Sequence, residues 1–119
     1  MANPNIVAVT NILGNTGVQQ VTTSATAIVT NSSGSGKVYK INSMVVSNVD
    51  ATNAATVTVD LYRSGTAYRF INQLTININT SYTPIDKTLS LYLLEGDTIR
   101  LTANANSRLE AICSWEEIN

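Results

Sequence analysis

The stretch SSGSGK at residues 32–37 is the part of the sequence closest to a nucleotide-binding motif. A phosphate-binding P-loop has a glycine, four further residues and then Gly-Lys-Ser/Thr, so that backbone amides wrap the phosphates and the last hydroxyl binds magnesium. Here Asn31 occupies the position of the first glycine, and Val38 follows Lys37 without a hydroxyl. The stretch also precedes an expected strand, whereas a P-loop opens a helix that contributes its dipole. We therefore interpret it as an inter-strand loop and predict no nucleotide binding.

Paired carboxylates could serve glycosidase chemistry, which needs two of them facing one cleft. Glu95 and Asp97 flank Gly96, and Glu116 is followed directly by Glu117. The Glu-Gly-Asp stretch is typical of a tight hairpin, because glycine supplies a positive φ and aspartate tolerates turn geometry. Adjacent residues of a strand point to opposite faces, so at most one of the two terminal glutamates faces any cleft. Neither pair predicts a catalytic site.

Metal ligands and nucleophiles are scarce, because the 119 residues include one cysteine and no histidine. Zinc sites are built from His and Cys, and the common nucleophilic triads use a histidine base. Residues 50–60 carry oxygen ligands without the spacing or glycine of a calcium loop. Binding of a single Ca²⁺ ion by loop carbonyls is the remaining alternative. Cys113 alternates with Ala111 and Trp115, which predicts a buried thiol. The sequence predicts no enzyme, no cofactor and no metal site.

Charge is low and scattered, with 13% charged residues and a formal net charge of −1. No block of like charge is present, so we expect neither a nucleic acid nor a membrane surface as partner. The first residues lack the basic region of a signal peptide, and no apolar run approaches the roughly 18 residues of a membrane span. We expect a protein that is made in a cytoplasm and stays soluble.

The elements that must position these residues are β-strands, because apolar and polar residues alternate with period 2. The alternation is strongest over residues 56–63, 73–80, 88–94, 98–103 and 108–117. Turn signals separate about nine such segments at intervals of roughly 8–12 residues, which is the spacing of a sandwich or barrel. We predict a single all-β domain over residues 1–119, folded as a two-sheet antiparallel β-sandwich of jelly-roll or immunoglobulin-like type.

The alternation also predicts which side chains form the core. The expected core residues are Val57, Val59, Leu61, Leu91, Ile99, Leu101, Cys113 and Trp115. Residues 37–49 have apolar side chains on both faces, with Ile41 and Val45 on one and Met44 and Val46 on the other. A strand buried on both sides would have this composition.

Residues 37–118 resemble small virion proteins of tailed bacteriophages, those of cyanobacterial phages in particular. The matching features are the turn at Asn48-Val49-Asp50, the Thr/Val-rich strand at 55–62, the pattern Leu-x-x-Gly-Asp-x-Ile-Arg at 93–100, and the ending at 115–118. The resemblance implies a β-sandwich component of the virion and no catalytic residues. It most specifically implies a capsid decoration protein, with a neck, tail or fibre module that recognises host glycans as the alternative. A clustered, solvent-exposed aromatic pair would favour that alternative.

A decoration protein would bind other copies of itself, with a trimer as the first expectation, and the major capsid protein. We expect interface residues among apolar side chains of the outer faces and of the N-terminal arm, and the alternative is that the outer-face residues fill a second packed layer. The candidates are Ile6, Val7, Val9, Met44, Val46, Tyr62, Tyr92 and Ile112. The arm, residues 1–13, would add a strand to a neighbour's sheet edge, unless it is simply the first strand of its own sandwich.

Overall fold

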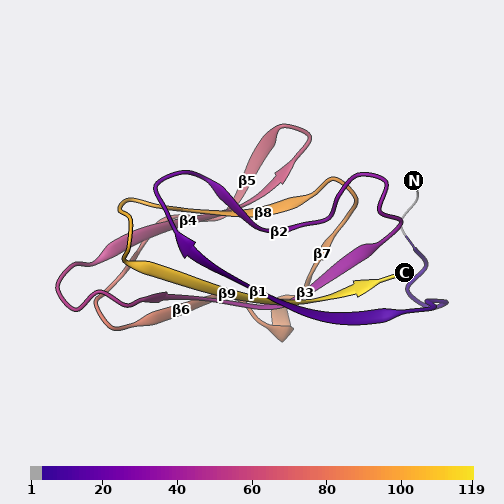
Figure 1. Cartoon of the computed structure of the whole chain (residues 1–119), viewed down its shortest axis with the longest axis horizontal. Helices are drawn as coiled ribbons and strands as arrows, with labels where there is room; N and C mark the ends of the chain where they lie inside the picture. The colour runs from indigo at the N-terminus through magenta and orange to yellow at the C-terminus, as the bar shows by residue number, and fades with distance from the viewer. Residues whose placement is uncertain (1–3) are drawn as a thin grey trace.

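The computed structural model of the chain describes residues 4–119, which form nine β-strands and one turn of 3₁₀ helix (Figure 1). The five-stranded sheet has the order β1-β9-β3-β6, with β7 also paired to β3, and the four-stranded sheet has the order β2-β8-β4-β5. All pairs are antiparallel, and the sheets pack as two layers, which confirms the predicted β-sandwich. The elements are β1 (Ile12–Val21), β2 (Thr26–Thr30), β3 (Val38–Asn48), β4 (Ala55–Arg63), β5 (Thr66–Ile76), β6 (Ser81–Ile85), η1 (Lys87–Leu89), β7 (Leu91–Leu93), β8 (Thr98–Ala103) and β9 (Leu109–Ile118).

One core lies between the sheets, built from side chains that alternate inward from both of them. In the four-stranded sheet Val59 lies opposite Leu101, and both are fully buried. Most of the expected core residues are buried, while Leu61, Leu91 and Trp115 are partly buried and pack against the core. Burying each large aliphatic side chain contributes about 1.5–3 kcal/mol, so this core is the main source of stability.

Strand β3 contains a bulge that changes which of its side chains face the core. Its register against β9 shifts between Ile41 and Ser43, so Asn42 is an extra residue. An extra residue turns the following side chains to the opposite face. Met44 and Val46 are therefore fully buried in the core, and our prediction that they lie on an outer face is wrong.

Residues 95–97 connect the two sheets. Strand β7 pairs with β3 in one sheet and β8 pairs with β2 and β4 in the other, so the predicted hairpin is wrong. Gly96 has a φ of +87°, in the left-handed region that favours glycine. The turn carries Asp97 into the interior, where the side chain is almost fully buried.

The predicted N-terminal arm divides into two parts. Residues 12–13 begin β1 and pair with β9, as an ordinary first strand would. Residues 4–11, which we call the N-terminal segment, form no strand. The segment is tied to the end of the chain, because the amides of Thr10 and Asn11 donate to the Asn119 carbonyl over 2.7 and 3.0 Å, and the Asn119 amide donates back to Asn11. The arm's first three residues lie outside the described part of the chain.

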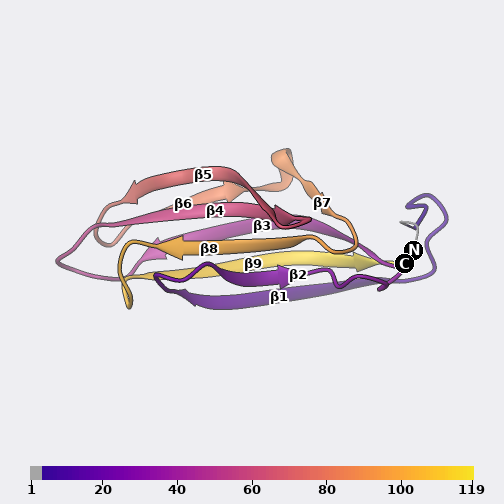
Figure 2. The ribbon, with the colours of Figure 1, turned by 90° about the horizontal axis from the view of Figure 1, so that it is seen from above.

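The sandwich is elongated, with extents of 49 × 26 × 19 Å. The N-terminal segment lies at one end of the long axis, on the right in Figures 1 and 2. The opposite end gathers four connections, which span residues 22–25, 49–54, 77–80 and 104–108. Within residues 4–119 no helix is long and apolar enough to cross a membrane.

Candidate functional surfaces

The loop at residues 31–37 is organised by the buried side chain of Asn31. The Asn31 Nδ2 donates to the carbonyls of Lys37 and Leu93 over 2.9 and 3.0 Å, and its Oδ1 accepts from the Ser35 hydroxyl over 2.6 Å. The Gly96 amide donates to the Asn31 carbonyl over 2.7 Å. These bonds join β2, β3 and β7 at one end of the sandwich, so the residue that breaks the P-loop pattern is the one that holds the loop.

An ion pair between the exposed Arg63 and the buried Asp97 lies beside this loop. Arg63 donates through Nε and Nη2 to the two carboxylate oxygens of Asp97 over 2.7 and 2.6 Å, and the Leu94 amide donates to the same carboxylate over 2.9 Å. Burial by itself raises the pKa of Asp97, but the bonds from Arg63 and Leu94 outweigh burial and hold the pKa below its usual value. The carboxylate is therefore ionised and links β4 to the turn before β8.

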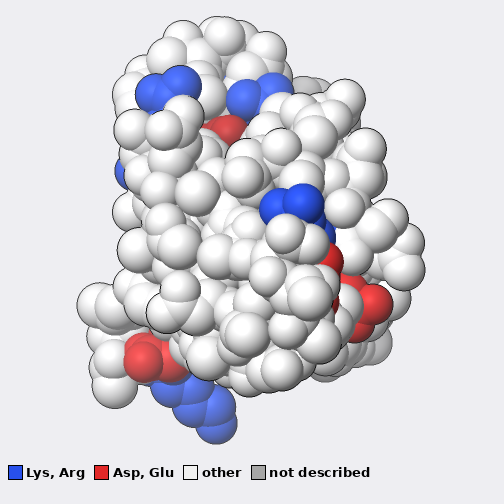
Figure 3. All heavy atoms as spheres, turned by 90° about the vertical axis from the view of Figure 1, so that its left-hand side faces the viewer, with Lys and Arg blue, Asp and Glu red and all other residues white. Residues whose placement is uncertain are grey.

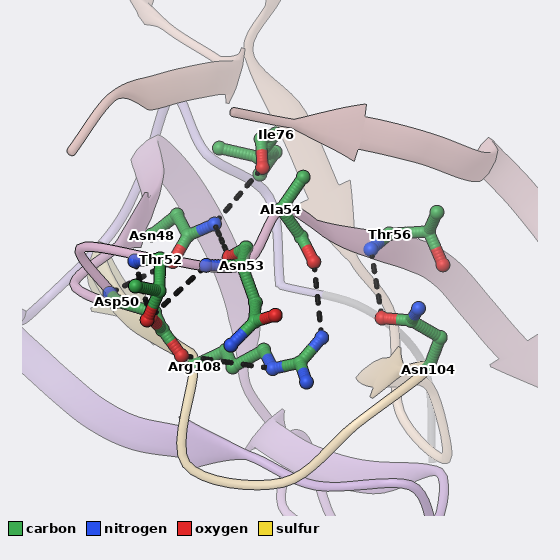
Figure 4. Close-up of polar contacts among 9 residues, drawn as sticks. All are labelled: Asn48, Asp50, Thr52, Asn53, Ala54, Thr56, Ile76, Asn104 and Arg108. Carbon is green, nitrogen blue, oxygen red and sulfur yellow. Dashed lines mark hydrogen bonds and ion pairs between the residues drawn. The ribbon is translucent and has the colours of Figure 1, made fainter. Parts of the chain in front are cut away.

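A second buried asparagine holds the opposite end (Figure 4). The Asn48 Nδ2 donates to the carbonyls of Asn53 and Ile76, each over 3.0 Å. In the same turn Asp50 accepts from the amide and hydroxyl of Thr52 and from the Asn53 amide, and these bonds lower the pKa of Asp50 to about 2. The turn that marked the resemblance to virion proteins is thus a hydrogen-bonded connection between β3 and β4.

The same close-up shows Arg108 reaching this turn from the connection between β8 and β9 (Figure 4). Its Nη1 donates to the Ala54 carbonyl over 3.1 Å, and its Nε lies 3.7 Å from a carboxylate oxygen of Asp50. Across the same group of loops, the Thr56 amide donates to the Asn104 Oδ1 over 2.9 Å. Two side chains of the β8–β9 connection therefore hold the β3–β4 connection and the start of β4 in place.

The outer face of the four-stranded sheet carries a charged cluster. Asp60 is buried although it points outward, because Arg100 donates to it over 2.9 Å and covers it. The Arg100 guanidinium lies 3.9 Å from the centroid of the Tyr62 ring, in cation–π geometry. Tyr62 is thus partly covered within its own chain, which leaves less of it for the interface that we predicted.

The stacked pair of Tyr39 and Trp115 lies where the two sheets approach each other near β1. Their ring centroids are 6.4 Å apart, and both rings pack against the core. Gly17 packs closely against the Trp115 ring, because a Cβ there would lie 3.0 Å from the ring and the neighbours would have to shift. Glu117 accepts from Lys37 and Asn15 over 3.1 and 2.6 Å. Burial, then the Glu117 charge, raises the pKa of Tyr39.

The charged side chains described above form ion pairs and hydrogen bonds that stabilise the loops and strands. In the part of the chain that the structure describes, no group of three or more His, Cys, Asp or Glu side chains is placed to hold a metal. Burial raises the pKa of the Cys113 thiol to about 12, so the thiol is protonated at neutral pH as well as inaccessible.

The remaining interface candidates lie at the surface, with different degrees of exposure. Val7 is the most exposed at 91%, Ile6 and Tyr92 are exposed, and Val9 is half-buried. Ile112 is 52% exposed on the outer face of β9.

The outer face of the five-stranded sheet is hollowed near the end opposite the N-terminal segment. Ile112 lies beside Val18 of β1, which is 75% exposed, and exposed Val49 follows β3. They line an apolar hollow of about 420 Å³. The other lining residues of this hollow are Gln19, Gln20, Ser47, Glu110 and Ala111.

A second hollow, of about 440 Å³, shares Ser47 and Val49 with the first and is mostly polar. Its other lining residues are Asn48, Asn79, Thr80 and Ser81. We call the two hollows together the end groove. Figure 3 faces this end of the molecule and shows few charged side chains, so most of the visible surface is uncharged.

Sequence reasoning found Ile112 but missed its neighbour Val18. The alternation around Val18 is weak, and the register of β1 against β9 decides which side chain lies beside Ile112. Val49 was noted within the Asn48-Val49-Asp50 turn, and its exposure at the end of β3 depends on the path of that turn.

Comparison with known proteins yields a fold and no family. No protein-family model matches the chain, and no curated protein matches it significantly in sequence. Among solved structures, the chain is similar to one from work on Bacillus endospore appendages, described as forming a family of disulfide-linked pili. The TM-score is 0.54 at 16% identity, over 100% of this chain and 96% of the other. The likeness extends over the whole sandwich.

Proposed function

We propose that this chain is a non-enzymatic structural subunit that acts by associating with other copies of itself in a repeating particle. The observation that carries the proposal is the presence of two uncovered apolar surfaces, the N-terminal segment and the apolar hollow of the end groove, at opposite ends of one sandwich. Contiguous exposed apolar surface on a soluble domain commonly marks an interaction site, because contact removes it from water.

The sequence resemblance of residues 37–118 supports a tailed-phage virion as that particle, with this chain as a decoration protein on the capsid. Its mechanism would be mechanical, since many copies bound across capsomer junctions each bury about 800 Å² against their neighbours. The summed contact opposes rupture of the shell. Partners would be further copies, with a trimer as the first expected species, and the major capsid protein.

The likeness to a pilus protein is compatible with a self-assembling role, although the chemistry of assembly would differ. That protein is described as forming disulfide-linked pili. In the present chain Cys113 is the sole cysteine, and it is fully buried in the core. A disulfide between copies would require the sandwich to open, so we propose that the copies associate without covalent links.

The glycan-binding alternative, a neck, tail or fibre module, gains no support from the one stacked aromatic pair of the described residues, although Tyr68 and Phe70 on β5 are exposed. Tyr39 and Trp115 do form a stacked pair, but both rings pack against the core and are partly buried. A sugar platform needs an open aromatic face, and this pair does not offer one.

Two measurements test the proposed function. Sedimentation velocity of the purified chain over a range of concentrations is expected to show larger species that increase with concentration. Gentle disruption of phage particles, followed by separation of heads from tails, is expected to leave the chain with the heads. A monomer at every concentration that is retained on neither heads nor tails would overturn the proposal, and retention on tails would overturn the decoration role.

A further inference from the structure

We propose that the N-terminal segment of one copy docks in the end groove of a second copy, so that copies associate head to tail. This inference rests on the proposed function, since it specifies the contact by which the subunit would self-associate. Ile6 and Val7 would enter the apolar hollow, beside Val18 and Ile112 of the other copy.

The segment cannot reach the groove of its own chain. Asn11 is hydrogen-bonded to Asn119 at the start of β1, which fixes that point. Ile6 lies five residues before Asn11, and five extended residues span at most about 18 Å. Val18 lies seven residues beyond Asn11 along β1, which at strand rise is about 23 Å away. A second copy is therefore required to bring the two surfaces together.

The two surfaces complement each other in polarity. Residues 4–13 contain no charged side chain, and among the residues that line the end groove only Glu110 is charged. The floor of the groove is apolar around Ile112, whereas its second hollow offers amide and hydroxyl groups to an incoming backbone. An apolar centre with a polar rim is the usual arrangement of a protein interface.

Pairing of two grooves face to face fits less well. A two-fold contact would place the Glu110 side chains of both copies in one interface, where like charges repel. It would also leave Val7 exposed to water. The head-to-tail contact covers both apolar surfaces, and because they lie at opposite ends of the molecule it repeats from copy to copy.

Two aspartate substitutions each remove one half of the contact. Val7→Asp alters the segment and leaves the groove intact, whereas Ile112→Asp alters the groove and leaves the segment intact. Each variant alone is expected to weaken self-association by about ten-fold or more in apparent Kd. An equimolar mixture retains one working contact and is expected to stop at a 1:1 heterodimer in sedimentation velocity.

The matched control is Leu89→Asp, which places the same charge on an exposed apolar residue of η1 and is expected to associate as the unaltered chain does. Circular dichroism establishes that each variant is folded, and Val18→Asp replaces the groove variant if Ile112→Asp unfolds. Self-association of Val7→Asp alone at the level of the unaltered chain, with Ile112→Asp monomeric, would overturn the inference in favour of groove-to-groove pairing. A mixture of the two variants that stays monomeric would overturn it as well. Association unaffected by either variant would also overturn it, while leaving the proposed function in place. A monomeric unaltered chain would overturn both.

Discussion

Each end of the sandwich is stabilised by a buried asparagine side chain, but the two asparagines have different neighbours. At one end Asn31, and at the other Asn48, buries an amide whose nitrogen donates to two main-chain carbonyls from separate segments. Beside Asn31 lies the buried carboxylate of Asp97 with Arg63, whereas beside Asn48 lies Asp50, bonded mainly to its own turn. The first end depends on a charge taken out of water, and the second depends on local hydrogen bonds. Their sensitivity to mutation and to pH should therefore differ.

Removal of Arg63 is expected to cause the largest loss of stability and so to show most clearly how the two ends differ. In Arg63→Ala the buried Asp97 carboxylate loses its only ion-pair partner among the described residues. Breaking a buried pair in this way costs about 3–5 kcal/mol, and because the Arg63 side chain is 45% exposed we expect about 3 kcal/mol. Urea denaturation measures the loss in the free energy of unfolding. A loss below about 1 kcal/mol would show that Asp97 is solvated, which would contradict the contrast between the ends.

The asparagines themselves should be equally important. Asn31→Ala and Asn48→Ala each leave two carbonyls without their side-chain donor, and each is expected to cost about 2 kcal/mol. Thermal unfolding of both variants measures the effect. Asn77→Ala is the matched control, because this side chain is exposed in a connection at the same end as Asn48. Unequal losses would show that one end governs unfolding.

Removal of Arg108 is the counterpart of the Arg63 change and should have a smaller effect. Its contact with Asp50 is long at 3.7 Å and partly exposed, so the pair contributes little. Arg108→Ala is expected to cost about 1 kcal/mol or less in urea denaturation. A loss equal to that of Arg63→Ala would remove the distinction between the two ends.

The smallest expected effect is on the melting temperature at low pH. The pKa of Asp50 is lowered from 3.8 to about 2 by bonds within its turn, so its ionised form favours the folded state. That contribution is complete above the unfolded pKa near 3.8 and is lost as the pH falls through about 2. Asp50→Asn should flatten the decrease in melting temperature over this range. Asp97, whose pKa is also lowered, should preserve part of the decrease in the variant.

The sequence predicted several strands in which alternation is unbroken, but it was wrong for the second half of residues 73–80, because β5 ends at Ile76 and residues 77–80 form a connection. Residues 56–63, 98–103 and 108–117 correspond closely to β4, β8 and β9, because each has one face on the core and one face toward solvent. It failed where the backbone departs from period 2. The extra residue Asn42 turned Met44 and Val46 inward, and a bulge of that kind depends on pairing with β9.

The polar residues of the two ends show a different limit of prediction from sequence. Turn signals at Asn48 and Asp97 were visible in the sequence, but their burial was not. Whether a turn side chain is buried depends on which carbonyls the distant strands leave without partners, as the bond from Asn48 to Ile76 shows. The apolar part of the groove was visible only at Ile112, because its neighbour is fixed by strand register.

Because Cys113 is buried, the reactivity of its thiol reports how often the folded chain opens. A thiol-specific reagent in the solvent can modify this side chain only after β9 separates from the opposite sheet, since the thiol is fully buried. The rate of labelling under native conditions therefore measures how often the molecule opens, without any introduced probe. Comparison of that rate between free chains and chains held in a particle would show how far assembly slows the opening.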